Sequence, residues 1–247
     1  MKTEPQINQD WYDELGDRWY QAQDDPIALL RAEVNFRLPW ILELLDRYFP
    51  NQKCDILDVG CGAGLLSNPL AKKGYRVTGI DLSKGSLKVA KQHDDTGCVK
   101  YAYMDAHHIS LGDKTMDVVC CMDVLEHVED PNKVICEIGR LLKPNGIFIF
   151  YTFNRTWKSW LFAIKAMEWF VKNTPEHIHL YKMFIKPSEF ENFLRNANMK
   201  LDFMVGIKPK LWHWSILKLL ITGKVPSDLT FGLTKSLDIG YGGVARQ

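Results

Sequence analysis

The sequence is nearly neutral, contains few cysteines and has no long hydrophobic run. Its 247 residues include 31 Lys or Arg and 30 Asp or Glu, which gives a formal net charge of +1. Such a balance produces no overall attraction to nucleic acid, so no nucleic-acid partner is expected. The six cysteines form no C-x-x-C pair, which argues against a zinc or redox site of that kind. They suit a reduced compartment, in which thiols pack as small apolar groups.

Leader and membrane-spanning segments are not predicted either. Residues 1–19 are acidic and lack both the apolar stretch of a secretory signal and the arginine-rich character of a transit peptide. No stretch of about 18 uncharged apolar residues occurs, so no transmembrane helix is expected. With 46% hydrophobic and 25% charged residues, the chain has the composition of a soluble globular protein. We therefore expect a cytoplasmic location.

The middle of the chain alternates short apolar runs with helical patterns. The predicted strands span residues 54–60, 75–81, 99–105, 116–125 and 147–153. The predicted helices between them span residues 65–74, 84–97 and 132–146. This alternation is typical of βαβ units, which build a mostly parallel sheet. The predicted fold class is therefore α/β, with a Rossmann-like, doubly wound sheet of seven strands.

The segments around this core divide the chain into four parts. Residues 1–50 are predicted to form a helical N-terminal cap, and residues 51–155 form the α/β core. Residues 156–186 are predicted to be an amphipathic lid inserted between the fifth and sixth strands. Residues 187–247 complete the sheet and contain a second aromatic and basic insertion, KLWHWSILKLLITGK.

Two helix starts are predicted from capping residues. Asp130 before Pro131 suits an N-cap followed by proline at the first helical position. Ser188 and Glu191 in KPSEFENFLRNAN have the spacing of a capping box. These positions predict where the helix before the fifth strand and the helix after the lid begin.

The segment ILDVGCGAG is the strongest motif in the sequence. A predicted buried strand runs through Asp58 into Gly60, Gly62 and Gly64, and a helix is expected to open at Leu65. Glycines allow a tight turn and a close approach of a ligand to the backbone. The form D-x-G-x-G-x-G differs from the G-x-G-x-x-G loop, which places a helix N-terminus against a pyrophosphate. It suits a cofactor without phosphates, such as S-adenosylmethionine.

Two further acids follow at the ends of successive predicted strands. Asp81 ends VTGID, where a carboxylate can accept hydrogen bonds from both ribose hydroxyls, and Asp105 in AYMDA is placed to meet an adenine amine. The predicted cofactor site also includes Asp58 and the neighbours of these two acids, Leu82 and Ala106. One competing interpretation is a plain glycine turn with helix-capping acids, and another is a nicotinamide cofactor. The coincidence of three motifs at strand ends argues against the first, and the glycine spacing argues against the second.

The segment CCMDVLEHVEDP ends the fourth predicted strand with Asp123, Glu126 and His127. His127 suits a general base, because an unperturbed histidine has a pKa of about 6.5. In the alternative interpretation, Glu126 and His127 only satisfy backbone groups of an acidic loop before a helix. The residues alone leave both interpretations open.

Together these segments resemble a known family. ILDVGCGAG, VTGID and LLKPNG are similar to motifs of class I S-adenosylmethionine-dependent methyltransferases. CCMDVLEHVEDP, YTFNRTWKSWL and KMFIKPSEF more narrowly resemble the O-methyltransferases of ubiquinone biosynthesis, which act on 3-demethylubiquinol and polyprenyldihydroxybenzoate. The resemblance runs from about Trp11 to the last residues. It implies methyl transfer to a phenolic hydroxyl of a polyprenylated catechol-type ubiquinone precursor, and association with other enzymes of that pathway.

The resemblance also implies roles for single residues. Gly60 and Asp81 match cofactor-binding positions, and Met122 matches a residue that lines the cofactor pocket. Arg37 in NFRLPWI matches an arginine that approaches the methionine end of the cofactor, with Arg31 as a competitor.

Family members are thought to bind a divalent metal through an E-x-x-E-H segment, which here consists of Asp123, Glu126 and His127. A bound Mg²⁺ or Zn²⁺ would orient two adjacent phenol oxygens and lower the pKa of one of them. Mg²⁺ would prefer the carboxylates, whereas Zn²⁺ would accept the imidazole. Glu126 and His127 are the predicted catalytic residues. His179 in EHIHLYKMF matches a family histidine and is a secondary candidate for the roof of the active site.

The segment TWKSWLFAIKAMEWFVK is rich in tryptophan and lysine. Its apolar residues follow helical spacing, and Lys158, Lys165 and Lys172 recur every seven residues. One interpretation is a basic amphipathic helix, Trp157–Lys172, that lies on a membrane surface. The other is a lid helix packed on the core. The resemblance favours peripheral membrane contact, and we expect the second insertion, Lys210–Lys224, to join the lid in an apolar doorway to the active site.

Two other functions compete with this interpretation. The first keeps cofactor and fold but transfers the methyl group to oxygen or nitrogen of another small lipophilic aromatic or natural-product acceptor. The second is a membrane-associated binding protein without catalysis, against which the intact glycine loop and Asp81 argue.

Overall fold

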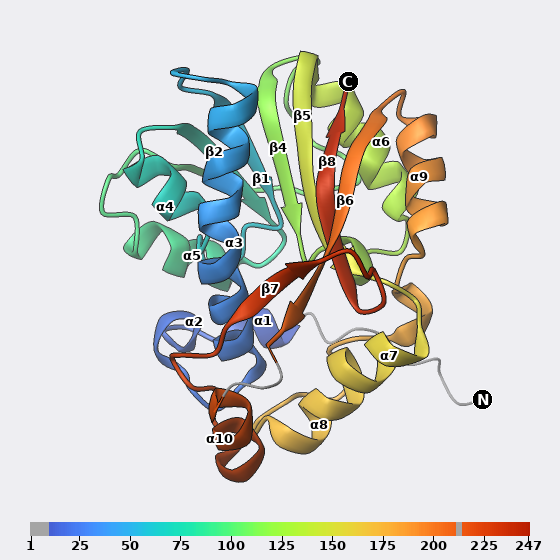
Figure 1. Ribbon diagram of the computed structural model, residues 1–247. Helices are drawn as coiled ribbons and strands as arrows, with labels where there is room; N and C mark the ends of the chain where they lie inside the picture. Colours follow the sequence, from blue (N-terminus) through green and yellow to red (C-terminus); the bar gives the residue numbers. More distant parts are fainter. Residues whose placement is uncertain (1–9, 211–213) are drawn as a thin grey trace, which may run out of the picture.

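The computed structural model describes residues 10–210 and 214–247, so the first nine residues of the predicted cap lie outside the described part. An eight-stranded sheet runs through the molecule, with helices on both of its faces (Figure 1). The strands are β1 (Asp55–Val59), β2 (Arg76–Asp81), β3 (Lys100–Tyr103), β4 (Met116–Met122), β5 (Leu142–Phe153), β6 (Lys200–Pro209), β7 (Phe231–Thr234) and β8 (Gly240–Arg246).

The strand order is β3-β2-β1-β4-β5-β8-β6-β7. The first five strands are parallel, whereas β8, β6 and β7 run antiparallel to their neighbours. The direction of winding reverses between β1 and β4, which is where open α/β sheets bind their ligands. The predicted doubly wound α/β fold is confirmed. One strand more than predicted is present, because the short segment Phe231–Thr234 pairs with the end of β6.

The helices form three groups. The N-terminal cap consists of α1 (Asp10–Glu14), α2 (Arg18–Gln21) and α3 (Pro26–Tyr48). The core helices are α4 (Ser67–Lys72), α5 (Lys84–Gln92), α6 (Pro131–Leu141) and α9 (Pro187–Asn196). The lid contains α7 (Trp157–Ser159), the π-helical η2 (Trp160–Lys165), α8 (Ala166–Phe170) and the 3-10 turn η3 (Tyr181–Met183), and the second insertion contains α10 (Trp214–Thr222).

Apolar residues on both faces of the central strands hold the layers together. Val118 of β4 joins a buried cluster with Ile41 of α3 and Leu70 of α4. Val119, its neighbour in the strand, joins the cluster on the opposite face with Ile138 of α6. Successive side chains of a strand point to opposite faces, so a strand covered on both sides becomes a continuous apolar run.

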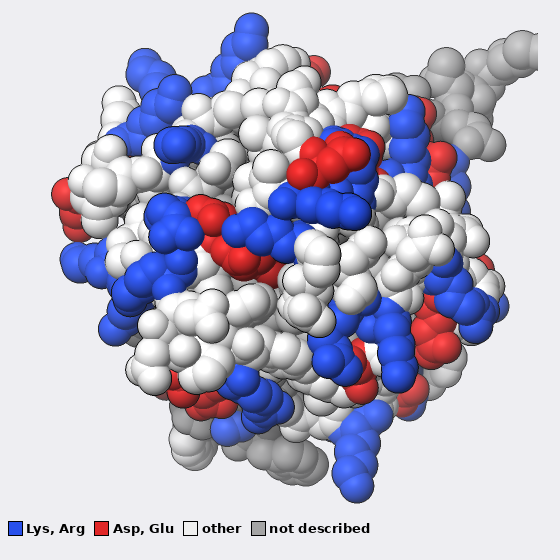
Figure 2. All heavy atoms as spheres, turned by 90° about the horizontal axis from the view of Figure 1, so that it is seen from above, with Lys and Arg blue, Asp and Glu red and all other residues white. Residues whose placement is uncertain are grey.

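Charges of both signs are interspersed at the end of the sheet where the parallel strands begin (Figure 2). Lys143 Nζ lies 3.0 Å from an Asp55 oxygen and 2.9 Å from an Asp117 oxygen. Asp55 also pairs with the exposed Arg76. Exposed ion pairs of this kind stabilise a fold only weakly. This face shows no patch of a single sign, in line with the balanced composition.

The structure corrects the predicted start of the helix after the lid. α9 begins at Pro187, and the Glu189 carboxylate accepts a hydrogen bond of 3.0 Å from the Lys186 N–H. The prediction that Ser188 and Glu191 form the cap was therefore wrong by two residues. Proline has the φ of a first helical position, and this preference decides where the helix begins.

The predicted start of α6 is confirmed, but its end is not. Asp130 Oδ1 accepts a hydrogen bond of 3.0 Å from the Lys133 N–H, and proline follows at the first helical position. The helix ends at Leu141 rather than near Gly146, and β5 begins directly after it. Pro144 disfavours helical backbone in the residue before it, so the chain is already extended there.

The lid lies between β5 and α9, but it is not one regular helix. The π-helical turn of η2 separates α7 from α8 and shifts the phase of the helical repeat. As a result Ile164 and Val171 are buried, whereas Trp157 is 66% exposed and Trp160 is 40% exposed. No helix in the described ranges is both long and apolar enough to cross a membrane.

Candidate active site

A large cavity opens at the carboxyl ends of the parallel strands. Its volume is about 2440 Å³, and its walls come from the N-terminal cap, the strand ends, the lid and the second insertion. Among the predicted site residues, the cavity is lined by Gly60, Gly62, Asp81, Leu82, Asp105, Ala106, Met122, Asp123, His127 and His179. Ten positions that are scattered in the sequence thus meet at one site.

The glycine loop forms one wall because its backbone takes a conformation that other residues disfavour. Gly60, Gly62 and Gly64 have φ values of +69°, +51° and +77°. A Cβ atom on Gly60 would lie 2.2 Å from Val124, and one on Gly62 would lie 2.9 Å from Trp19. The helix after the loop, α4, begins at Ser67 rather than at the predicted Leu65. A side chain at Gly60 or Gly62 would therefore collide with Val124 or Trp19.

Asp81 braces the same loop from the end of β2. One carboxylate oxygen accepts a hydrogen bond of 2.8 Å from the Gly62 N–H, and the other accepts one of 2.8 Å from the Ser83 N–H. Burial raises the pKa of Asp81, and both backbone donors oppose that rise. Carboxylate oxygens have further lone pairs, so the same group can still accept hydrogen bonds from ribose hydroxyls.

Asp105 and Asp58 have different surroundings. Asp105 lines the cavity and accepts a hydrogen bond of 2.8 Å from the His107 N–H. Asp58 lies beneath the glycine loop, where it is 3% exposed and accepts a hydrogen bond of 2.6 Å from Ser67 Oγ. Burial raises the pKa of Asp58 to about 7. Asp58 is therefore bonded to the first residue of α4 and does not line the cavity, whereas Asp105 does.

Asp123, the first residue after β4, has a φ of +58°. Its carboxylate is held by both terminal nitrogens of Arg37, at 3.1 and 2.5 Å. The Arg37 guanidinium is 1% exposed, lies 4.5 Å from the centroid of the Tyr151 ring and also lies 3.6 Å from Glu33. Burial lowers the pKa of Arg37, but the two carboxylates raise it more, so its charge is retained.

The structure therefore places Arg37 in an ion pair with Asp123 and not on the cavity wall. Its competitor Arg31 donates hydrogen bonds to backbone carbonyls of the cap, including Trp19 at 3.0 Å. Arg31 thus holds the N-terminal helices together.

Glu126 is fully buried behind the cavity wall. Its Oε2 accepts a hydrogen bond of 2.8 Å from Thr152 Oγ1. Burial, and next the Asp123 charge, raise the pKa of Glu126 to about 8, so this carboxyl is mostly protonated at neutral pH. A protonated carboxyl bonded to Thr152 is not a general base facing the ligand.

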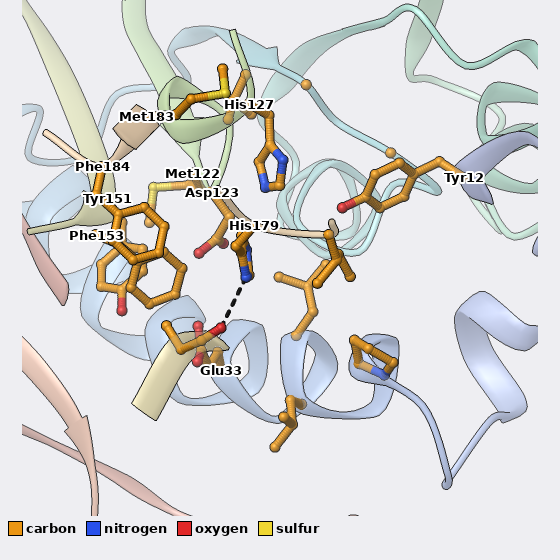
Figure 3. A pocket seen from close by; sticks show the side chains of 18 of the residues that line it. Tyr12, Glu33, Met122, Asp123, His127, Tyr151, Phe153, His179, Met183 and Phe184 are labelled. Carbon is orange, nitrogen blue, oxygen red and sulfur yellow. Dashed lines mark hydrogen bonds between the residues drawn. The ribbon is translucent and has the colours of Figure 1, made fainter. Parts of the chain in front are cut away.

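Two histidines line the cavity side by side. The ring centroids of His127 and His179 are 5.1 Å apart, and Tyr12 of the cap faces His127 with an edge-on ring 6.3 Å away (Figure 3). His179 Nδ1 lies 3.1 Å from the Ala163 carbonyl oxygen. Because a carbonyl can only accept, Nδ1 carries the proton and Nε2 of the neutral ring has the lone pair. Burial lowers the pKa of His179 to about 4 and also lowers that of His127, so both rings are neutral.

The predicted metal set is not formed by these side chains. The Asp123 carboxylate is taken up by Arg37, and Glu126 is protonated and bonded to Thr152. No group of three His, Cys, Asp or Glu side chains that could hold a metal ion exists among the residues the structure describes. The donor set of Asp123, Glu126 and His127 therefore does not fit Mg²⁺ or Zn²⁺ in this arrangement, which corrects the sequence-based expectation.

The cavity wall also contains residues that were not predicted, and four examples bear on the chemistry of the site. Tyr12 and Trp19 of the cap, Glu33 of α3 and Tyr151 of β5 line the cavity. Burial, followed by the charges of Glu126 and Asp123, raises the pKa of Tyr12, whose phenol therefore remains a hydrogen-bond donor. Tyr12, Trp19 and Glu33 lie outside the quoted motifs and reach the site only because the cap packs on the sheet. Tyr151 opens the quoted segment YTFNRTWKSWL, but no role was predicted for it.

The comparisons with known proteins agree with this geometry. Residues 57–150 match the family model described as a methyltransferase domain. The fold is similar to that of a magnesium protoporphyrin IX methyltransferase from Synechocystis PCC 6803, solved with bound SAH, with a TM-score of 0.64 and 20% identity over 96% of this chain and 97% of that one. A methyltransferase from Methanosarcina mazei gives a TM-score of 0.58 at 22% identity, over 83% and 96% of the two chains. Fold and site together define an S-adenosylmethionine-dependent methyltransferase.

Relatives with higher sequence identity define the family within this class. It is 39% identical over 206 residues to a ubiquinone biosynthesis O-methyltransferase of Bordetella avium, covering 82% of this chain and 84% of the relative. It is 37% identical over 234 residues to the protein of that name in Vibrio campbellii, covering 93% and 91%. The chain belongs to the ubiquinone biosynthesis O-methyltransferase family.

Proposed function

We propose that the protein transfers the methyl group of S-adenosylmethionine to a phenolic hydroxyl of a polyprenylated, catechol-type ubiquinone precursor. The observation that supports this most directly is the composition of the cavity. Its lining combines the glycine loop and the strand-end acids, two neutral histidines, and apolar side chains of the lid and the second insertion. A cofactor, an ionisable oxygen and a lipophilic chain can thus be held in one continuous space.

In this proposal the cofactor lies along the carboxyl ends of β1, β2 and β3. Gly60 and Gly62 allow its close approach, Asp81 accepts from the ribose hydroxyls, and Asp105 meets the adenine amine. Leu82, Ala106 and Met122 contribute apolar contacts to the bound cofactor. Asp58 and Arg37 act indirectly, Asp58 by holding the start of α4 after the loop and Arg37 by fixing Asp123.

The cofactor supplies an activated methyl group, and the chain supplies an acceptor for the phenol proton. His179 is the proposed base, because its Nδ1–H is fixed by the Ala163 carbonyl and its Nε2 lone pair is available. With S-adenosylmethionine bound, which would supply the methyl group, His179 Nε2 would take the proton that the phenol oxygen loses. His127, 5.1 Å away, orients the acceptor beside it. Placing oxygen and methyl carbon in line at about 3–3.5 Å supplies much of the rate.

We further propose that the protein is cytoplasmic and contacts membranes peripherally through Trp157–Lys172. Trp157, Trp160, Trp169 and Phe170 are all between 37% and 66% exposed. Exposed aromatic side chains along α7, η2 and α8 suit the interface between lipid head groups and acyl chains. A lipophilic acceptor would be collected there.

The test is methyl transfer from labelled S-adenosylmethionine to a short-chain demethylubiquinol, with His179→Ala and the control His108→Ala. His108 is bonded to Lys133 outside the cavity. We expect transfer by the parent protein and by His108→Ala, and a loss of about 10²-fold or more in kcat for His179→Ala. Cofactor binding without methylation of any catechol would refute the proposed substrate class. Methylation of another lipophilic aromatic instead would support the alternative acceptor.

A further inference from the structure

One part of the cavity is lined, among the described residues, by apolar side chains of the lid, of α3, of the second insertion and of the adjoining ends of β6 and β7. We call it the apolar arm. In it, the side chains from α8 and η2, from the second insertion and from α3 are aliphatic, aromatic or proline. The described residues of this arm are Leu29, Leu30, Phe162, Ala166, Met167, Phe170, Val171, Ile207, Pro209, Ile216, Leu219, Leu220, Leu229 and Phe231.

The two walls of the apolar arm are fastened to each other and to the cap. The Lys172 N–H, just after α8, donates to the Gly223 carbonyl, just after α10, at 3.3 Å. The Val225 N–H donates to the Gln23 carbonyl of the cap at 2.7 Å. α8 and α10 lie side by side at the same end of the molecule (Figure 1). The arm is therefore a formed part of the cavity wall.

The size of the cavity exceeds what a cofactor and a catechol ring require. Pockets for a single drug-sized ligand have volumes of about 300–1,000 Å³. The volume here is about 2440 Å³, more than twice the upper limit of that range. The described residues of the apolar arm include no charged side chain that could orient a polar ligand.

The arm is open at one end. Leu220 of α10 is 44% exposed and Phe170 of α8 is 37% exposed, although both line the cavity. Most other arm residues are buried or half-buried. A chain longer than the arm can therefore continue outward past these two side chains.

We propose that the apolar arm binds the prenyl chain of the acceptor, with Leu220 and Phe170 at its exit, and so determines the preferred chain length. This inference rests on the proposed function, because it assigns a site to the tail of that substrate. The head group lies at the histidines, and the first prenyl units run between α8 and α10.

The experiment uses the full chain in one fixed nonionic detergent, with labelled S-adenosylmethionine. Three catechol acceptors share the head group and carry no tail, a short prenyl chain or a long one. The variants are Leu220→Ser and its matched control Leu217→Ser. Leu217 is on the same helix and 46% exposed, but it is not part of the cavity wall. A second variant, Leu220→Trp, fills the exit without removing apolar surface.

For the parent protein we expect KM to fall as the prenyl chain lengthens. Leu220→Ser should raise the KM for the prenylated acceptors about fivefold relative to the KM for the tail-less one, which corresponds to about 1 kcal/mol. Leu217→Ser should leave this ratio unchanged. Leu220→Trp should raise the KM for the acceptor with the long chain more than for the one with the short chain. If Leu220→Ser does not fold, this second variant tests whether the apolar arm binds the prenyl chain.

Two results would overturn the inference while leaving the proposed function intact. One is a KM of the parent protein that is independent of the tail, although the tail-less catechol is methylated. The other is an equal change of the ratio in Leu217→Ser and Leu220→Ser, which would assign the effect to surface hydrophobicity. If no catechol is methylated with or without a tail, the proposed function itself fails and the inference fails with it.

Discussion

Replacing Arg37 with leucine tests whether the buried ion pair with Asp123 holds the cap and the active site together. Arg37 is 1% exposed, and both of its terminal nitrogens bind Asp123, which is only 12% exposed. The substitution leaves the Asp123 carboxylate and the neighbouring Glu33 in the interior without their cation. Breaking a buried pair by removing one partner costs about 3–5 kcal/mol. We expect the free energy of unfolding of Arg37→Leu to fall by this amount near neutral pH.

The loss should depend on pH, with a sign that follows from Glu33. Burial raises the pKa of Glu33 from 4.5 to about 7, and Arg37 opposes this rise. Because the folded-state pKa is above the ordinary value, ionisation of Glu33 destabilises the fold as pH rises through this range. Without Arg37 the pKa rises further and the destabilisation increases. The effect of Arg37→Leu should therefore be larger at about pH 8 than at about pH 5.

Urea denaturation followed by intrinsic fluorescence at both pH values measures these free energies. The control is Arg246→Leu, which removes an exposed arginine whose guanidinium lies 2.8 Å from Asp202. Exposed pairs contribute about 0–1 kcal/mol, so this variant should remain close to the parent protein. An equal loss in both variants, or a loss for Arg37→Leu that shrinks as pH rises, would contradict the reasoning.

Three more predictions follow from the site. Gly62→Ala should weaken S-adenosylhomocysteine binding at least about tenfold in calorimetry, because the new methyl group would collide with Trp19 and the φ of this residue is +51°. The control Gly97→Ala has a similar φ of +61° but open space around it, so this variant should bind S-adenosylhomocysteine as the parent protein does. Glu126→Gln should become more stable than the parent protein in urea titrations as pH rises toward about 8, because the parent loses stability when this buried carboxyl ionises. A difference in the free energy of unfolding between the variant and the parent that shrinks as pH rises would contradict this prediction. EDTA should leave the rate of methyl transfer unchanged, and a rate restored only by Mg²⁺ or Zn²⁺ would reinstate the metal role.

The sheet could be predicted from the sequence because its information is local. Continuous apolar runs such as that ending at Met122 identify central strands, and glycine and proline mark the turns between them. The predicted helix boundaries were wrong where a local feature of the chain had more influence than the wider sequence pattern. Pro187 set the start of α9 against the spacing of Ser188 and Glu191, and the π-helical turn Trp160–Lys165 broke a repeat that looks continuous in the sequence.

Only those residues of the candidate site that belong to local sequence motifs could be predicted. The glycine loop and the acids at the strand ends require no knowledge of packing, so Gly62, Asp81 and Asp105 were found. The partner of Asp123 was missed, because Arg37 is 86 positions away and reaches it only when α3 lies across the sheet. The sequence does not distinguish a carboxylate that forms an ion pair with an arginine from one that binds a metal ion.

The position of α10 within the fold has an evolutionary consequence. It lies in the connection between β6 and β7, and the pairing of Pro209 with Phe231 closes the base of that connection. Residues beyond this base can lengthen, shorten or change without disturbing a strand, the glycine loop or the histidines. If the apolar arm binds the prenyl chain as proposed, a preference for a different tail can evolve by changes in this one insertion while the residues of the glycine loop and the histidines stay the same.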